Sequence, residues 1–240
     1  MKLDDIKKLQ QKKYRSELGA CLVEGEHLVL ELQQALQLRP ELQAAELYLT
    51  EEYRDWPTPL VKHEIGSKQM RALSATKSPQ GILAVLPIDA IRPSPADGDI
   101  AIYLHEVQDP GNLGTILRTL AWFGGFRCLL SPNSVDPFNP KVIRASMGAI
   151  FHVPLELDVP LESLAGRYNR IGCLDMQGEP LSAPAFSECD CYLFGNEARG
   201  VPREQLDSLS ARLFTIAGAS QIESLNLATA VSLSVYERRR

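Results

Sequence analysis

The chain has 240 residues, of which 45% are hydrophobic and 23% charged, and its formal net charge is −5. This length allows one large or two small domains with buried cores, and the acidic balance argues against binding nucleic acid through bulk positive charge. No run approaches the roughly 18–20 apolar residues that span a membrane, and the charged N-terminal stretch lacks the apolar core of a secretory signal. The five scattered cysteines predict reduced, buried thiols in a cytoplasmic protein, and neither they nor the four histidines show metal-ligand spacing.

Residues 1–90 predict a small α/β domain. In chain order we expect a basic helix, a strand, a helix, a strand, a short helix and a strand, at residues 2–16, 22–24, 27–36, 44–50, 67–73 and 81–86. The next stretch, IDAIRPSPADGD at residues 88–99, is rich in turn formers and almost without periodicity. It therefore marks a boundary between a domain at 1–90 and a second at 98–240.

The second region alternates short apolar strands with helices. The strands are expected at residues 101–104, 126–130, 171–174, 191–194 and 213–216. Continuous apolar runs of this kind are typical of parallel strands covered on both faces, so the pattern predicts an open, mostly parallel α/β sheet. The final helix, over 223–238, is apolar nearly all round and must be covered on more than one face. A second copy of the chain is the partner that we expect on the free face.

The strand at 101–104 is followed by DPGNLGTILRTLAWFG, residues 109–124, in which a glycine-bearing turn leads into a helix. Strand, turn and helix together form a common ligand-binding corner in α/β proteins. Asn112 is predicted to cap this helix, and Arg118 carries a permanent charge that needs an anionic partner or a structural carboxylate. The glycine spacing fits neither a dinucleotide site nor a phosphate loop, which weakens the interpretation as an oxidoreductase or a nucleotide hydrolase.

Two later stretches, YLFGNEARGVP at 192–202 and IESLNLATAVSLSVYE at 222–237, complete a pattern. With the first stretch they resemble the three motifs of the SpoU/TrmH family of SPOUT methyltransferases, whose members transfer a methyl group from S-adenosylmethionine to a ribose 2′-hydroxyl of RNA. NPKVIRASMGAIFHVP, 139–154, is similar to the family between its first two motifs, and YRSELGACLVEGEHLVLEL, 14–32, to its appended domain. The resemblance implies an α/β fold, with a mostly parallel-sheet SPOUT-type domain that ends in a C-terminal trefoil knot, preceded by a small α/β RNA-binding domain.

The resemblance also implies which residues contact S-adenosylmethionine. Carried over position by position, they are Leu174, Gly195, Ile216, Ser224 and Leu225. An adenine edge is well read by backbone groups in a tight loop, and the glycine-bearing loop after the strand at 191–194 suits that purpose.

The catalytic arginine of the family maps to Arg118. Free arginine has a pKa above ~12, so Arg118 acts either as a base or as a clamp on the adjacent phosphate, and the sequence leaves both roles open. Asn112 and Asn226 offer amides that orient the reacting groups, and Glu197 is expected to hold Arg118 or a loop N–H. No histidine in the third motif is placed to activate Ser224, which argues against a hydrolase.

RNA contacts are expected from Arg144, in the predicted helix start RASMG, and from the basic cluster that includes Lys12, Lys13 and Arg15. A solvated helix face is the alternative for that cluster. Ribosomal RNA is favoured as substrate over transfer RNA because of the additional N-terminal domain. The competing interpretations are a non-catalytic RNA-binding protein of the same fold and, more distantly, a generic nucleotide-binding α/β enzyme.

Overall fold

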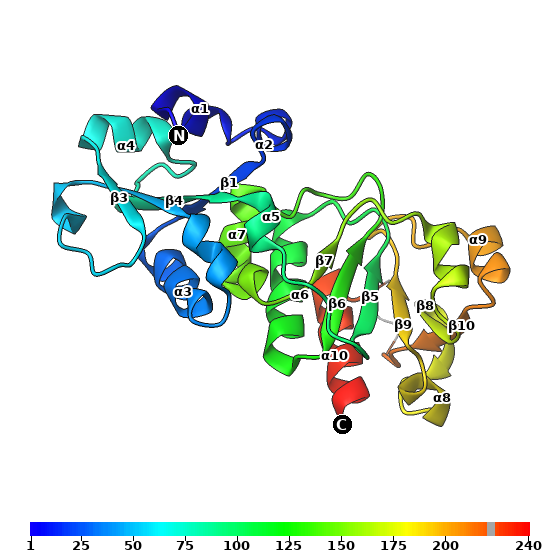
Figure 1. Cartoon of the computed structure of the whole chain (residues 1–240). Coiled ribbons are helices and arrows are strands. Elements are labelled where there is room, and N and C mark those ends of the chain that lie inside the picture. Colours follow the sequence, from blue (N-terminus) through cyan, green and yellow to red (C-terminus); the bar gives the residue numbers. More distant parts are fainter. Residues whose placement is uncertain (220–223) are drawn as a thin grey trace. The chain divides into compact units, whose positions relative to one another are not determined.

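A computed structural model describes residues 1–219 and 224–240 and divides the chain into two units (Figure 1). Unit 1 comprises Met1–Pro93 and Asp136–His152, and unit 2 comprises Ser94–Val135 and Val153–Arg240. The first division falls inside the predicted boundary at 88–99. The sequence did not indicate that residues 136–152 pack with the N-terminal region. No helix within the described ranges is long and apolar enough to cross a membrane.

Unit 1 is built around a four-stranded sheet of order β1-β4-β2-β3, in which only β2 and β3 run parallel. Its elements are α1 (Leu3–Lys8), α2 (Lys12–Leu18), β1 (Ala20–Glu24), α3 (Glu26–Leu36), η1 (Pro40–Ala44), β2 (Glu46–Leu49), η2 (Glu51–Tyr53), β3 (Val61–Glu64), α4 (Ser67–Leu73), β4 (Ile82–Pro87), α5 (Ile88–Ile91), α7 (Pro140–Ser146) and η3 (Ala149–Phe151). The sequence missed β3, because this strand is largely exposed and carries no apolar alternation.

The expected helix over 2–16 is two helices, with a break at residues 9–11. Arg15, only 3% exposed, explains the break. Its Nη1 donates to the carbonyl of Leu9 at 2.8 Å, where α1 has ended, and its Nε donates to Oδ2 of Asp136 at 2.8 Å. One buried side chain therefore connects both helices to the 136–152 segment.

A second buried arginine, Arg39, holds the other end of that segment. Its Nη1 donates to the carbonyls of Phe151 at 2.7 Å and Ile91 at 3.1 Å, and its Nη2 donates to the carbonyl of Ala90 at 2.7 Å. Guanidinium groups carry five N–H donors, so each arginine can satisfy several backbone carbonyls that the surrounding core shields from water. Residues 136–152 are therefore an integral part of unit 1.

Unit 2 contains a six-stranded sheet of order β10-β8-β9-β5-β6-β7, in which every neighbouring pair is parallel, as predicted. Its elements are β5 (Ile100–Leu104), α6 (Pro110–Phe123), β6 (Phe126–Leu130), β7 (Leu155–Glu156), η4 (Leu161–Gly166), β8 (Ile171–Pro180), α8 (Pro184–Ser187), β9 (Cys191–Phe194), α9 (Arg203–Ser208), β10 (Arg212–Thr215) and α10 (Leu227–Arg239). The trefoil knot stays a prediction.

Helices α6 and α10 lie side by side in unit 2 (Figure 1). Helix α10 begins after Asn226, later than the predicted start at 223; Ile222 and Glu223, the first residues of the third motif, lie outside the described residues. The large side chains of Trp122, Leu233 and Tyr236 on the two helices remain exposed, at 84%, 41% and 55%. Part of each helix is therefore uncovered within one chain, and the homodimer partner expected on the free face of α10 stays a prediction.

Candidate functional site

A pocket of about 450 Å³ opens beside the middle of β8, where β9 and β10 end and α10 begins. Ligands of open α/β sheets bind outside the carboxyl ends of the strands, which is where this pocket lies. Its lining includes all five residues expected to contact the cofactor, Leu174, Gly195, Ile216, Ser224 and Leu225, and adds Asp175, Met176, Phe194, Asn196, Glu197, Ala198, Gly200, Thr215, Asn226, Leu227 and Ala230. Segments that are distant in the sequence thus form one cavity.

Gly195 is required in this pocket by close backbone packing. A Cβ at this position would lie 2.4 Å from the carbonyl carbon of Gly200 and 2.7 Å from the nitrogen of Val201. Atoms cannot approach so closely, so any other residue would force the loop after β9 to open. The absent side chain leaves the backbone at the end of β9 bare at the pocket wall.

Three of the four predicted catalytic residues form a directed chain of hydrogen bonds. Asn226 is the N-cap of α10, and its Oδ1 accepts from the N–H groups of Ala228 at 2.9 Å and Thr229 at 3.3 Å. Its Nδ2 therefore faces away from the helix and donates to Oδ1 of Asn112 at 2.8 Å. The amide of Asn112 donates in turn to Oε1 of Glu197 at 3.1 Å. Because the helix cap orients the first amide, it orients the whole chain.

The prediction that Asn112 caps its helix is wrong. Asp109 is the N-cap of α6, and its carboxylate accepts from the backbone N–H of Asn112 at 2.7 Å, with Pro110 at the first helical position. The Asn112 side chain is consequently free of a capping role. It joins the first turn of α6 to the loop after β9 and to the start of α10.

Arg118 lies apart from this chain of hydrogen bonds. It is six residues beyond Asn112 on α6, about 9 Å further along the helix axis and on a different face. It is exposed and forms no hydrogen bond or ion pair within the described part of the chain, so the expected contact with Glu197 is not present. Arg118 shares an exposed stripe of α6 with Thr115 and Trp122.

The loop after β9 is held by residues that the sequence did not single out. Asn196, 8% exposed, donates from Nδ2 to the carbonyl of Glu106 at 2.8 Å and accepts from the N–H groups of Ala198 and Arg199 through Oδ1. Arg199 also pairs with the Glu106 carboxylate at 2.7 Å. The sequence could have indicated this role of Asn196, because asparagine commonly closes turns through its side chain and this one follows Gly195 in the second motif.

His105, which follows β5 beside this loop, is a titratable group with a perturbed pKa near the site. Burial lowers the pKa of its imidazole, and the nearby Glu106 carboxylate raises it only in part. The ring is therefore neutral at pH 7. The backbone N–H of His105 donates to the carbonyl of Phe194 at 2.9 Å, which extends the pairing of β5 with β9.

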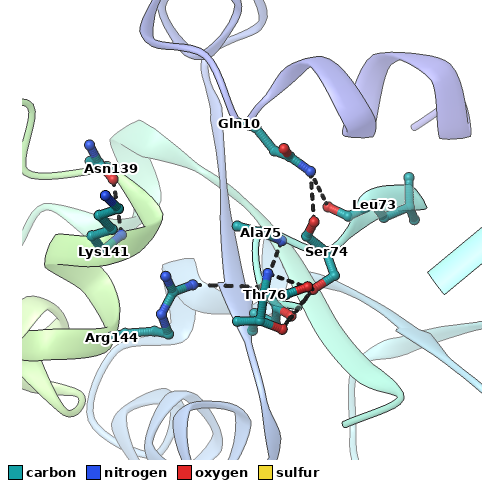
Figure 2. A network of polar contacts seen from close by, with 9 residues as sticks. Gln10, Leu73, Ser74, Ala75, Thr76, Asn139, Lys141 and Arg144 are labelled. Carbon is teal, nitrogen blue, oxygen red and sulfur yellow. Dashed lines mark hydrogen bonds and ion pairs between the residues drawn. The ribbon is translucent and has the colours of Figure 1, made fainter. Parts of the chain in front are cut away.

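The residues expected to bind RNA have different surroundings within unit 1. Lys12 and Lys13 are exposed on α2, whereas Arg15 is buried in its pair with Asp136 and is not available for a surface contact. Arg144 is one-third exposed and lies 3.9 Å from the buried carboxylate of Glu24. Figure 2 shows it directed toward the turn at residues 74–76.

The expectation that RASMG starts a helix is wrong. Arg144 and Ser146 lie in the last turn of α7, whose N-cap is Asn139. Met147 and Gly148 follow in the left-handed conformation, with φ values of +50° and +91°, which ends the helix.

Two family models match the chain, each over a different part of its length. Residues 99–236 match the model of the SpoU rRNA Methylase family, and residues 2–84 match the MRM3-like substrate binding domain. The chain is 31% identical to the 23S rRNA (guanosine(2553)-2'-O)-methyltransferase RlmP of Bacillus subtilis, over 99% of this chain and 96% of that protein.

Solved structures show the same fold over nearly the whole chain. A TrmH-family structure from Porphyromonas gingivalis has a TM-score of 0.82 and 30% identity, and covers 99% of this chain and 96% of that one. An AdoMet-bound rRNA methyltransferase from Sinorhizobium meliloti has a TM-score of 0.81 and 25% identity, with 99% and 93% coverage.

Proposed function

The chain belongs to the SpoU rRNA Methylase family, and from this premise we propose that it transfers a methyl group from S-adenosylmethionine to a ribose 2′-hydroxyl of RNA. The observation that carries the proposal is the hydrogen-bonded chain of Asn226, Asn112 and Glu197 beside the pocket of about 450 Å³. These residues come from all three motifs. A fold that had kept only RNA binding would have no need for this arrangement at the pocket.

The pocket suits S-adenosylmethionine in size and chemistry. Its volume lies within the range of about 300–1,000 Å³ that is typical of small-molecule sites. Leu174, Ile216 and Leu225 supply apolar walls for an adenosine, and bare backbone at Gly195 suits an adenine edge. The Glu197 carboxylate at the pocket suits a ligand whose sulfonium and ammonium groups are cationic. Bound S-adenosylmethionine would supply an electrophilic methyl group.

In this mechanism the protein positions the ribose hydroxyl and stabilises the charge that develops on its oxygen. A ribose hydroxyl is a very weak acid, so attack on the methyl carbon needs either a proton acceptor or strong stabilisation of the developing alkoxide. We assign hydroxyl orientation to the amides of Asn112 and Asn226 and to the Glu197 carboxylate that holds them. Arg118, with no partner among the described residues, is assigned to the RNA phosphate next to the reacting ribose.

Ribosomal RNA is the proposed substrate. The support is the substrate-binding domain over residues 2–84, together with a relative named for 23S rRNA methylation that aligns over 99% of this chain. We assign phosphate contacts to Lys12 and Lys13, and to the exposed part of Arg144. Arg15 is not part of this proposed surface because Asp136 and Leu9 occupy its guanidinium.

A homodimer through α6 and α10 is also part of the proposal. Trp122, Leu233 and Tyr236 give the two helices an exposed apolar stripe, which water would disfavour in an isolated chain. Arg118 lies on the same face of α6 as Trp122. A second copy that covers the stripe would therefore also lie beside Arg118, the residue proposed to bind the RNA phosphate. The five buried free thiols favour a cytoplasmic location, where thiols stay reduced.

The proposal is tested by incubating the protein with radiolabelled S-adenosylmethionine and RNA from cells that lack the gene. We expect label in the ribosomal fraction, and loss of that label with Arg118→Ala or Glu197→Gln. Calorimetry with S-adenosylhomocysteine on the same variants separates lost chemistry from lost cofactor binding. A wild-type protein that binds S-adenosylhomocysteine but labels no RNA, free or within ribosomal particles, would contradict the enzymatic interpretation.

A further inference from the structure

Strand β8 leaves the sheet for five residues at the pocket. Cys173 pairs with Leu213 of β10, but the next residue of β10, Phe214, pairs with Glu179. The intervening residues 174–178 therefore project out of the β8–β10 ladder as a bulge. Bulges often lie next to active sites, where they redirect side chains. Here Leu174, Asp175 and Met176 of the bulge all line the pocket, although the sequence predicted that the strand stops at 174.

Several contacts fix the shape of this bulge. A Cβ at Gly178 would lie 2.6 Å from the carbonyl carbon of Leu213, so the bulge folds tightly over the backbone of β10. The hydroxyl of Thr215 donates to the carbonyl of Met176 at 3.3 Å. The backbone N–H of Gln177 donates to Oδ1 of Asp175 at 3.0 Å. The geometry is therefore set before any ligand binds.

The Asp175 carboxylate uses only one of its two oxygens in these contacts. Arg203 donates to Oδ1 at 2.8 Å, the atom that also accepts from Gln177, while Oδ2 forms no hydrogen bond with any described residue. The side chain is 21% exposed and borders the pocket. A carboxylate oxygen has two acceptor sites, so Asp175 presents an unused acceptor at the pocket wall.

We propose that Asp175 binds the ribose hydroxyls of S-adenosylmethionine, accepting their hydrogen bonds through Oδ2. This assignment rests on the proposed function. Asp175 lies on the β10 side of the pocket, next to Thr215 and Ile216, whereas Glu197 lies on the side of the hydrogen-bonded amides where the methyl group must react. The adenosine therefore belongs beside Asp175. The Arg203 guanidinium offsets the negative charge of Asp175, which disfavours the ammonium group as its partner, but hydroxyl donors need only an acceptor.

Calorimetry with two ligands tests this assignment without relying on activity. S-adenosylhomocysteine carries the ribose and the ammonium group, whereas 5′-methylthioadenosine carries the ribose alone. We expect Asp175→Ala to raise the Kd of both ligands about tenfold, the size of effect for a lost hydrogen bond to a charged group. Asp175→Asn keeps an oxygen at this position, so it should raise the Kd of both ligands less than Asp175→Ala does. Arg203→Ala removes the partner of Asp175 but leaves its acceptor, and should change either Kd less than about threefold.

Each other outcome overturns the assignment in a distinct way. An unchanged Kd in Asp175→Ala would show that the carboxylate does not touch the ligand. A loss confined to S-adenosylhomocysteine would identify the ammonium group as the partner instead of the ribose. If Arg203→Ala lost as much affinity as Asp175→Ala, the effect of Asp175 would come from its support of the bulge and not from a contact with the ligand. If the wild type bound neither ligand, the proposed cofactor itself would be contradicted, and this assignment with it.

Discussion

At the scale of single residues, Asn226 links helix formation to the proposed chemistry. Its Oδ1 caps α10, and this leaves only Nδ2 to face Asn112. The two functions can be separated by substitution, because serine also caps helices well but has no amide to donate across to Asn112.

We predict that Asn226→Ser keeps the stability of the wild type and loses about 10- to 100-fold in methyl transfer, because Asn112 is no longer oriented. Asn226→Ala should lose the same activity and, in addition, about 1 kcal/mol of unfolding free energy with the cap. Steady-state kinetics and urea unfolding measure the two effects. Full activity in Asn226→Ser would show that the amide chain does not contribute to catalysis.

The cysteines provide a second prediction at this scale. Burial raises the pKa of Cys21, Cys128 and Cys173 to about 12. Because these values lie far above pH 7, the thiols stay protonated in the folded protein, and only the thiolate is a good nucleophile. Iodoacetamide should therefore label none of the five cysteines at pH 7.5 until denaturant is added, as followed by mass spectrometry. Rapid labelling of one cysteine in the native protein would contradict the buried position of that residue.

The residues expected to contact the cofactor came from the family resemblance, and the structure brings them together at one pocket, while their contact with the cofactor stays a prediction. Gly195 and Ile216 are examples, and both line the pocket. The helix cap was misjudged because Asp109 and Asn112 are both good capping residues, and only the Pro110 between them favours Asp109. The unused acceptor Oδ2 of Asp175 could not be predicted, because its position at the pocket depends on a bulge that forms only when β8 and β10 pair.

At the scale of elements, a buried arginine joins α1, α2 and the segment 136–152. Sequence alone placed Arg15 in a basic surface cluster, since its neighbours Lys12 and Lys13 are exposed on the same helix. Arg15 is buried, unlike these two lysines, because its guanidinium pairs with the carboxylate of Asp136, more than a hundred residues away. No local pattern contains that information.

We predict that Arg15→Met lowers the unfolding free energy of the protein by about 3 kcal/mol, because it leaves Asp136 unpaired in a largely buried position. Lys13→Met on the same helix is the matched control and should change stability by less than about 0.5 kcal/mol. Chemical denaturation followed by circular dichroism measures both. Equal effects of the two substitutions would mean that Arg15 is not held as described.

The strands of the parallel sheet were predicted well because each is a continuous apolar run, and those at 126–130 and 191–194 match β6 and β9 in full. The exposed β3 and the two-residue β7 carry no such signal and were missed. The same physics therefore explains the successes and the failures: only strands that are buried on both faces leave an unambiguous pattern.

At the scale of the whole molecule, the exposed stripe on α6 and α10 predicts assembly. We expect light scattering to give a mass of twice the chain mass of 26.6 kDa at micromolar concentration. Trp122→Glu and Tyr236→Lys place charges on the stripe and should give monomers, whereas Met176→Glu, an exposed site on the pocket rim, should leave the dimer intact. A monomeric wild type would contradict the proposed interface.

Each of the two units is made of two segments that are separate in the sequence. The predicted domains 1–90 and 98–240 place α7 with the parallel sheet, but this helix packs with β1 in unit 1. Removal of residues 1–93 would therefore also expose Val142, Ile143 and Phe151 of the inserted segment, which are buried in unit 1. The predicted boundary at 88–99 includes Pro93, where the first segment of unit 1 ends, but the sequence could not reveal the insertion, since its contacts with β1 are distant in sequence.

The central claim, methyl transfer to a ribose oxygen, is tested most directly by alkaline hydrolysis of labelled RNA. Alkali cleaves RNA through attack of the 2′-hydroxyl on the adjacent phosphate, so a 2′-O-methyl group blocks cleavage at its own nucleotide. After transfer of radiolabelled methyl by the wild-type protein, we predict label in alkali-resistant dinucleotides. Label in mononucleotides would place the methyl group on a base and would contradict the proposed reaction.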